Sequence, residues 1–350
     1  FSDKDKSKIV FSRNKNYYNW GSNSNIDYIK ILVERNLPDI VQRILKSQRS
    51  EDWLSIDLLI NTPNDIVNYE KIQAGGKDHL KFIPYSSNSW YGIAINTEKP
   101  YLNNRDVRLA LTHAIDIQQI IKDNYAKVNV GSKPEPIAER VAGPFNPEYG
   151  VGDMKLLPKE YDLEKAKEYL EGAGPISIED GKPYYKGKEI SLKLIYSTAK
   201  VLDGSAENIV VVKIQNYIEK LQIKINLVKC SAKDYNKKLA NSDFDLAFQH
   251  IELGSGSNIE PLFRKDSPSN TTRFSNPLLT DYLVKFNRAA TGKQKKEYGK
   301  QIHKIVYDEA PYIYLYQLKK IMTIRDELIT DKKIVPRKFF PHIGSWYFSY

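Results

Sequence analysis

The sequence predicts an α/β protein of two domains, and three observations lead to this prediction. The chain has 350 residues, which is long for a single hydrophobic core. Short apolar segments typical of strands alternate with amphipathic segments typical of helices. Within residues 191–228 a strand, a long helix and a second strand follow one another, and such a βαβ unit pairs its strands in parallel through a right-handed crossover.

The stretch Tyr85–Tyr125 is the part around which the predicted fold is organised. Residues Trp90–Asn96 are aromatic and β-branched, so they predict a buried strand that ends in a polar loop. Asn104 offers a side-chain cap, and apolar residues at helical spacing predict a helix from about Arg105. A strand that feeds a capped helix places loop side chains at the edge of a crevice, where we expect function.

The other elements follow from the same patterns. Before the central stretch, the sequence predicts short helices at 38–46 and from 61, and strands at 8–12, 26–33, 57–60 and 81–84. After it, residues 128–159 form a proline-rich belt that is expected to cross a surface in extended form. Asp162 then caps a helix that ends near Gly172.

The last half of the chain contains a hairpin turn at 181–187 and a glycine- and serine-rich loop at His250–Pro261. Its predicted strands are 191–197, 223–228, 244–248, 312–318 and 321–324. Its predicted helices are 206–221, 231–240, 278–289 and 293–309.

Composition restricts the class of protein. Lys and Arg number 53 against 43 Asp and Glu, but the basic residues form no stripe or known module, so we expect no nucleic-acid partner. Cys230 is the single cysteine, which excludes an intramolecular disulfide and a multi-cysteine metal site. No run approaches the roughly 20 apolar residues that span a bilayer. The chain opens on Phe1, so we expect a leader and further N-terminal residues to be missing.

Four motifs stand in a fixed order along the chain. They are Asn96–Asp116 with RDVRLALTHAID, Gly143–Gly174 with AGPFNPEYG and YDLEKAKEYLEGAG, Phe244–Ala247 with FDLA, and Asp308–Tyr316 with DEAPYIYLY. Together they resemble the solute-binding proteins of peptide and nickel ABC importers, a family that includes oligopeptide- and dipeptide-binding proteins. The resemblance covers nearly the whole chain.

The resemblance implies a type II periplasmic-binding-protein-like fold, in which two α/β lobes close over a ligand in the cleft between them. The hinge segments would lie near 88–97 and 318–326. Residues 1–97 and 325–350 would form the first lobe, and 98–324 the second. Because residues 1–30 resemble the middle of the family pattern, the first lobe is expected to be incomplete, without the N-terminal third of a family member.

The resemblance also implies how the protein works in the cell. A bacterial protein of this family would be a periplasmic or extracellular monomer, with or without a lipid anchor. It would capture short peptides and deliver them to the permease subunits of an ABC importer.

The candidate ligand-binding residues lie on two segments that we expect to face one another across the cleft. On the first, Asn88, Ser89, Trp90 and Tyr91 enter the hinge strand. The aromatic rings would wall the cleft, and the strand backbone would pair with an extended peptide. Successive strand residues point to opposite faces, so at most one of the two rings would contact the ligand; both would equally fit a core.

The second segment follows a central strand, whose carboxyl end borders a crevice in α/β folds. Its candidates are His250, Glu252, Ser257 and Asn258. The resemblance implies that the corresponding loop of peptide binders contains a Trp followed shortly by an Asp. This Asp captures the amino terminus of the peptide. Here Ser257 lies nearest the position of the Asp, so Glu252 or Glu260 would have to supply the carboxylate for a ligand ammonium.

Three alternatives to peptide transport stay open. His250 allows nickel or a metal chelate as the ligand of the same fold, although no second His or Cys lies at ligand spacing. Cys230 with His250 as its base would suit a peptide hydrolase, but no glycine-rich turn surrounds Cys230. The 24 tyrosines and the basic surface would suit an adhesive surface protein. We predict no enzyme, no resident metal and no cofactor.

Overall fold

The structure is a computed structural model that describes residues 8–12, 28–32, 55–59, 74, 80–125, 127–130, 133–146, 150–253, 257–325, 328–329 and 347–348. Contacts between residues divide the chain into two units. The smaller contains residues 1–85, 127–137 and 319–350, and the larger contains 86–126 and 138–318. The chain therefore passes between the units after residues 85, 126, 137 and 318. The two lobes of the predicted fold were expected to meet at residues 97/98 and 324/325. The division into units by contacts does not test these lobe boundaries, so they stay predictions.

The smaller unit is described through its strands. β1 (Lys8–Ser12) pairs with β2 (Tyr28–Leu32) in antiparallel fashion. β3 (Ser55–Leu59) pairs with Lys320–Ile324 of β15 (Tyr312–Arg325). The other strands are β4 (Leu80–Ser86), β6 (Lys127–Val130), β7 (Lys133–Pro136), β16 (Leu328–Ile329) and β17 (Tyr347–Phe348). The helices predicted at 38–46 and from 61 lie outside the described residues.

A mixed sheet organises the larger unit, in the strand order β13, β12, β14, β5, β15. β12 (Ser191–Ser197) pairs in parallel with β13 (Lys224–Cys230) and with β14 (Leu246–Glu252). The predicted βαβ crossover is confirmed, because α6 (Ala206–Ile218) connects β12 to β13. β5 (Ser89–Ile95) runs antiparallel between β14 and β15.

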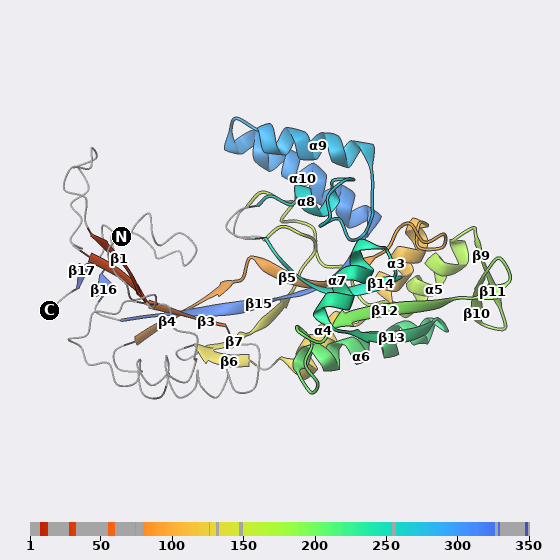
Figure 1. Cartoon of the computed structure of the whole chain (residues 1–350), viewed down its shortest axis with the longest axis horizontal. Coiled ribbons are helices and arrows are strands. Elements are labelled where there is room, and N and C mark those ends of the chain that lie inside the picture. Colours follow the sequence, from red (N-terminus) through yellow and green to blue (C-terminus); the bar gives the residue numbers. More distant parts are fainter. Residues whose placement is uncertain are drawn as a thin grey trace. The chain divides into compact units, whose positions relative to one another are not determined.

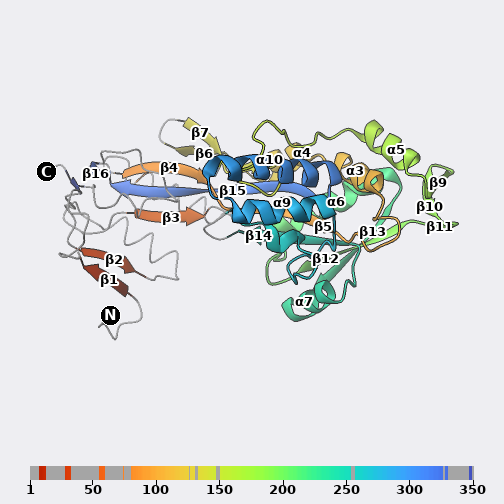
Figure 2. The ribbon, with the colours of Figure 1, turned by 90° about the horizontal axis from the view of Figure 1, so that it is seen from above.

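Helices lie on both sides of this sheet. In Figures 1 and 2, α9 (Pro277–Arg288) and α10 (Gly292–Glu309) lie on one side and α6 on the other. The remaining long helices are α3 (Arg105–His113), α4 (Ile117–Asn124), α5 (Leu163–Gly172) and α7 (Ala232–Ala240). Each of these seven helices begins after a side chain whose oxygen accepts a hydrogen bond from a free N–H of the first turn. The caps are Asn104, Asp116, Asp162, Ser205, Ser231, Asn276 and Thr291.

Four segments differ from the prediction. The region of the predicted hairpin is a meander of three strands, β9 (Ile176–Glu179), β10 (Lys182–Tyr185) and β11 (Lys188–Glu189). The proline-rich belt includes most of the paired strands β6 and β7 and the short strand β8 (Ala138–Arg140), which pairs with β15. β14 continues beyond residue 248 to Glu252, because its last residues pair with β5. β15 is one continuous strand, because residues 319 and 320 keep backbone partners in the smaller unit.

The belt packs against α10 through glycines and one histidine. His303 is 3% exposed, and its Nδ1 accepts a hydrogen bond from the Asp153 backbone N–H at 3.1 Å. A Cβ added at Gly143 would overlap the His303 ring, and one added at Gly299 would overlap the carbonyl oxygen of Val151. Glycine is therefore required at both positions for the belt to approach the helix this closely.

Acid is expected to destabilise the larger unit through its buried histidines. Burial lowers the pKa of His303 and of His113, whose Nδ1 lies 2.8 Å from the Glu160 carbonyl oxygen. The unfolded chain binds protons at the ordinary histidine pKa near 6.5, so this stability is present above that pH and is lost as the pH falls below it. Each histidine contributes at most about 1.4 kcal/mol per pH unit. Urea unfolding at pH 7.5 and 5.5 measures this fall.

The variant His303→Gln tests the assignment, since Gln keeps an acceptor for the Asp153 N–H but does not titrate. Its free energy of unfolding should fall less between pH 7.5 and 5.5 than that of the wild type. His250→Gln makes the same change at a histidine that is less buried, with 19% of its side chain exposed. An equal fall in all three proteins would mean that other groups determine the acid sensitivity.

Candidate ligand-binding site

The two predicted ligand-binding segments lie side by side on paired strands. Tyr91 of β5 is opposite His250 of β14, and Ser89 is opposite Glu252. The expectation that the segments face one another across a gap between separate halves is wrong, because both belong to the larger unit and to one sheet. The antiparallel pairing of β5 with β14 brings the candidates together instead.

The backbone of β5 is not available to a ligand strand. β14 pairs with β5 from Ser89 to Ile95, and β15 pairs with the other edge from Tyr91 to Ala94. The expectation that this strand pairs with an extended peptide is therefore wrong, since an internal strand has no free row of N–H and C=O groups. A ligand at this sheet would have to contact side chains.

Trp90 belongs to the core on the side of the sheet that α9 and α10 cover. It is 3% exposed and lies in one apolar cluster with Tyr312 and Tyr314 of β15. The Trp90 ring meets the Tyr312 ring edge to face at 5.2 Å and the Tyr314 ring at 4.9 Å. These contacts fit the core interpretation of Trp90, and its place in a ligand site stays a prediction.

Tyr91 points to the opposite side of the sheet, as the alternation along a strand requires. Its ring stacks on the His250 ring at 4.3 Å with an interplanar angle of 11°, and on the Tyr316 ring at 5.0 Å. The register between β5 and β15 shifts between Tyr314 and Tyr316. Such a bulge turns a side chain to the other face. It places Tyr316 beside Tyr91, whereas Tyr314 stays with Trp90.

A buried carboxylate lies under these rings and was not predicted from the sequence. The Tyr91 hydroxyl donates to Oε1 of Glu207 at 3.3 Å, and the Tyr125 hydroxyl donates to the Tyr316 hydroxyl at 2.8 Å. Burial raises the pKa of Tyr91, Tyr125 and Tyr316, and the charge of Glu207 adds to the rise in each. The sequence did contain a sign of this burial, because Glu207 lies at helical spacing before the apolar residues of α6. These buried residues are Val210, Val211, Ile214 and Ile218.

The other candidates lie around the end of β14. The Nδ1 atom of His250 lies 3.6 Å from the Oε1 atom of Glu252. The His250 side chain is 19% exposed and the Glu252 side chain is 69% exposed. Asn258 is exposed, and its side-chain oxygen accepts a hydrogen bond from the Glu260 N–H at 3.0 Å, which forms the turn before α8 (Glu260–Phe263). Ser257 is half-buried beside it. Residues 254–256 of this loop lie outside the described residues.

The candidates at the start of β5 have neighbours within the larger unit. The Asn88 carbonyl accepts a hydrogen bond from the Leu253 N–H at 2.9 Å, which extends the β5–β14 pairing by one step. The hydroxyls of Ser87 and Ser89 are 3.0 Å apart. These backbone and hydroxyl contacts hold the first residues of β5 beside the last residues of β14.

The geometry does not favour a Cys230–His250 hydrolase. Cys230 ends β13, which β12 separates from β14, and neighbouring strands are about 4.8 Å apart. Cys230 also belongs to the cluster on the Trp90 side of the sheet, whereas His250 stacks on Tyr91 on the other side. Burial raises the pKa of the thiol, which disfavours the thiolate nucleophile.

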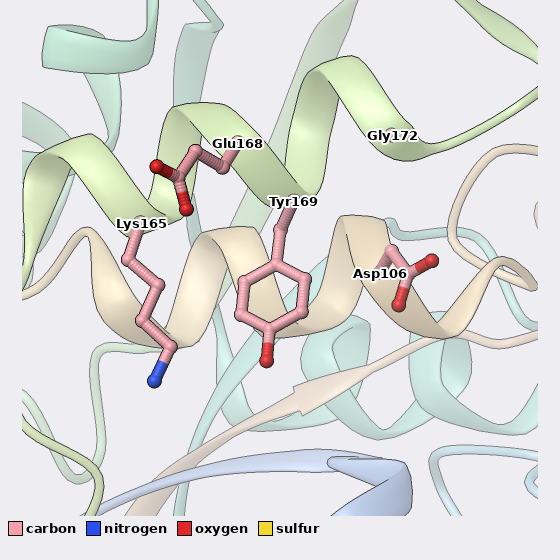
Figure 3. Close-up of a pocket in the computed structure, with 5 residues that line it drawn as sticks. All are labelled: Asp106, Lys165, Glu168, Tyr169 and Gly172. Atoms are coloured by element: carbon pink, nitrogen blue, oxygen red, sulfur yellow. The ribbon is translucent and has the colours of Figure 1, made fainter.

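Two further observations concern the metal alternative, which rests on His250, and the pocket of Figure 3, whose lining contains none of the candidates. Among the described residues, no group of three or more His, Cys, Asp and Glu side chains is placed to hold a metal ion. A pocket of about 320 Å³ lies at α3 and α5, and Figure 3 shows its lining. The lining residues are Asp106, Lys165, Glu168, Tyr169 and Gly172.

The chain matches a known family and three curated relatives, two of which are described here. The family described as "Bacterial extracellular solute-binding proteins, family 5 Middle" matches residues 1–272. Heme-binding protein A of Haemophilus influenzae is 24% identical over 313 residues, which cover 87% of this chain and 51% of that protein. Oligopeptide-binding protein OppA of Bacillus subtilis is 25% identical over 249 residues, which cover 70% and 42%. The chain thus spans about half the length of the relatives that it matches.

A solved structure shows the same fold. The oligopeptide-binding protein AppA from Bacillus subtilis, in complex with a nonapeptide, superposes with a TM-score of 0.61 at 18% identity, covering 100% of this chain and 66% of AppA. The fold class is therefore confirmed as that of type II periplasmic binding proteins. No helix in the described part of the chain is long and apolar enough to cross a membrane.

Proposed function

Because this chain belongs to the family 5 bacterial extracellular solute-binding proteins, we propose that it captures short peptides for an ABC importer. The match of the family over residues 1–272 carries this proposal. Oligopeptide-binding relatives and the nonapeptide complex of AppA support peptide as the ligand. In this proposal the protein binds its ligand and returns it unchanged, which is supported by relatives that are named as binding proteins.

The mechanism is a shift between open and closed conformations. A ligand favours the closed state only to the extent that it binds that state more tightly. The permease subunits in the membrane then recognise the closed conformation. The protein works as a monomer outside the cytoplasm, and a lipid anchor would keep it near the permease.

Mass spectrometry of material released by denaturing the natural full-length protein tests the ligand class. We expect short peptides. In a second measurement, a library of short peptides should raise the thermal unfolding midpoint of the full-length protein, because a ligand at a hundredfold excess over its Kd stabilises the folded state by about 2.7 kcal/mol. Peptides recovered after hours of incubation should be uncleaved.

Other outcomes would contradict the proposal in distinguishable ways. A midpoint that rises with nickel, a metal chelate or heme but with no peptide would replace the ligand class within the same family. Cleaved peptides would indicate a hydrolase. The variant His250→Ala should weaken peptide binding by about tenfold if the predicted site is used, since hot-spot truncations cost more than about 1 kcal/mol. Glu189→Ala on β11, an exposed acid, is the control.

A further inference from the structure

Four exposed lysines form a stripe along α10. Lys293, Lys296, Lys300 and Lys304 follow one another at intervals of three, four and four residues. Residues at this spacing lie on one face of a helix, one above the other. The expectation that the basic residues of the chain form no stripe is therefore wrong for this helix.

Most of the charge of this lysine stripe is not balanced by acids. The Lys304 ammonium pairs with the Asp308 carboxylate at 2.8 Å. In the part of the chain that the structure describes, the other three lysines of the stripe form no ion pair. Glu297, the acid nearest to them on α10, accepts a hydrogen bond from a glutamine instead. Exposed lysines elsewhere in the larger unit do pair with acids, for example on β13 and α9.

The order of charges along α10 is unfavourable for the helix itself. The first turn contains no acid and includes Lys293, whereas Asp308 and Glu309 close the last turn. The helix dipole favours acids at the first turn and cations at the last turn, so this arrangement opposes it. The lysines at the start of α10 therefore do not serve the stability of the helix, which points to a partner outside the fold.

The proline-rich belt runs beside the same face of α10. A Cβ added at Gly150 would lie 3.9 Å from the Cε atom of Lys296. Further along, the Lys159 ammonium lies 3.4 Å from the centre of the Tyr307 ring. Tyr307 follows Lys304 by three residues and so continues the face that carries the lysine stripe. The belt between these two contacts therefore borders the stripe.

This part of the belt exposes apolar side chains. Leu157 is 73% exposed, which is the highest value among the large apolar side chains that the structure describes, and Met154 is 44% exposed. Lys155 between them is exposed as well. Apolar side chains flanked by lysines are typical of surfaces that lie on a bilayer, where the apolar groups reach the acyl boundary and the lysines extend to the headgroups.

A membrane surface fits these features better than a protein surface does. Lysine is depleted at protein–protein interfaces relative to the rest of the protein surface. Anionic lipids, by contrast, attract clusters of lysines, and each lysine near the surface adds to the binding. The chain matches a family that is described as extracellular, which argues against a nucleic acid as the anionic partner.

We propose that the lysine stripe of α10, together with Met154 and Leu157 of the belt, docks on the anionic headgroups of a membrane. The lysines bind headgroup phosphates, and the two apolar side chains enter between the headgroups. This inference goes beyond the proposed function, because it does not depend on the ligand. A docked protein would search for its permease in the plane of the membrane.

Co-sedimentation with lipid vesicles tests the lysine stripe. The full-length protein, made without lipid modification, should bind vesicles of phosphatidylcholine and phosphatidylglycerol in equal amounts, and should not bind phosphatidylcholine alone. The double variant Lys296→Gln, Lys300→Gln should bind about 30-fold more weakly at about 0.1 M salt, since one lysine near an anionic surface changes the binding constant about fivefold.

A second double variant controls for net charge. Lys182→Gln, Lys188→Gln makes the same charge change at exposed lysines of the β9–β11 meander, which lies at one end of the larger unit (Figures 1 and 2). This variant should bind the vesicles within about twofold of the wild type. An equal loss in both double variants would show that net charge, and not the stripe, determines binding, and the inference would be wrong.

The variant Leu157→Gln tests the apolar part of the patch. It should bind the same vesicles about fivefold more weakly, because the leucine no longer gains from leaving water. Its binding should keep the salt dependence of the wild type, whereas the Lys296→Gln, Lys300→Gln variant should lose part of that dependence. Leu202→Gln is the matched control at a leucine that is 64% exposed before α6, and it should bind like the wild type.

Two further results would overturn the inference. The first is a wild-type protein that does not bind the anionic vesicles. If that protein nevertheless bound the isolated permease, and did so more weakly with Lys296→Gln, Lys300→Gln, the partner would be an acidic protein surface. The second is unchanged vesicle binding by this double variant. Peptide binding by the variants, measured from the thermal unfolding midpoint, should equal that of the wild type, so the docking surface and the proposed function fail separately.

Discussion

Replacing Arg108 by Met should lower the free energy of unfolding of the larger unit by about 3 to 5 kcal/mol, because it breaks a buried charged network. Arg108 is 2% exposed, and its guanidinium donates to the carbonyl oxygens of Glu309 at 2.8 Å and Leu102 at 3.1 Å. It also donates to the Asn103 carbonyl at 2.8 Å and to the Glu309 carboxylate at 3.1 Å. Met fills much of the volume but leaves these acceptors without donors.

The protonation of Arg108 supports a large effect. Burial lowers the pKa of its guanidinium to about 10, although the carboxylate of Glu309 opposes this change. The side chain is still charged at neutral pH, so the fold holds a buried cation that its four acceptors stabilise. Removing the cation leaves the Glu309 carboxylate and three carbonyl oxygens with fewer hydrogen bonds.

Arg105→Met is the matched control on the same helix. Arg105 is 49% exposed, and its Nε donates to the Asp308 carbonyl at 2.8 Å. Because water can replace this contact, we expect a loss of less than about 1 kcal/mol. Urea unfolding followed by circular dichroism measures both variants. Equal losses at the two positions would show that the network around Arg108 has no special role in stability.

Replacing Gly299 by Ala should destabilise the larger unit by about 3 kcal/mol or more, since the added Cβ would overlap a backbone atom that cannot rotate away. Gly299 is buried in α10, and the atom in question is the carbonyl oxygen of Val151 in the belt. In an exposed helix interior the same change stabilises by about 1 kcal/mol. The sign of the effect therefore reports the close packing of belt and helix.

Gly292→Ala is the control at the start of the same helix. An added Cβ at Gly292 meets no atom within 4 Å. Its stability should be unchanged or higher by up to about 1 kcal/mol. Limited proteolysis adds a second measurement, because Gly299→Ala should expose the belt at residues 141–146 and 150–153 to cleavage. A stable Gly299→Ala protein with a protected belt would show that the belt is able to shift at little cost.

Local patterns explain why most elements of the larger unit could be predicted. The helix that begins at Arg105 follows a capping Asn104, and the α6 helix follows a capping Ser205. Caps, glycines and apolar spacing act within a few residues of the chain, so they can be read from the sequence. The strand ends were less accurate, since β14 extends to Glu252 only because β5 lies beside it.

The site could be predicted only in part, because its contacts join distant parts of the chain. The paired candidates Tyr91 and His250 were named, but their stacking depends on a strand register that no local pattern specifies. Tyr316 was placed in a strand, yet its orientation depends on a bulge one residue before it. Glu207 looked like an ordinary helix residue, and its burial follows from the packing of α6 on the sheet.

The motifs of the sequence also connect to one another in space. The Asn96 side chain donates to the Phe244 carbonyl at 2.9 Å, which joins the first motif to the third. Arg108 joins the first motif to the fourth through Glu309. The Asp162 N–H donates to the His113 carbonyl at 2.9 Å, which joins the first motif to the second. In this chain these motif residues therefore stabilise the fold, and they do not identify the ligand.

The four passages of the chain between its two units set an order of events during synthesis. The strand β3 of the smaller unit is translated long before its partner Lys320–Ile324. The larger unit has all its segments once residue 318 has been made. It can therefore complete its sheet first, while the smaller unit waits with an unpaired β3 edge that is open to chaperones, because distant pairings form late.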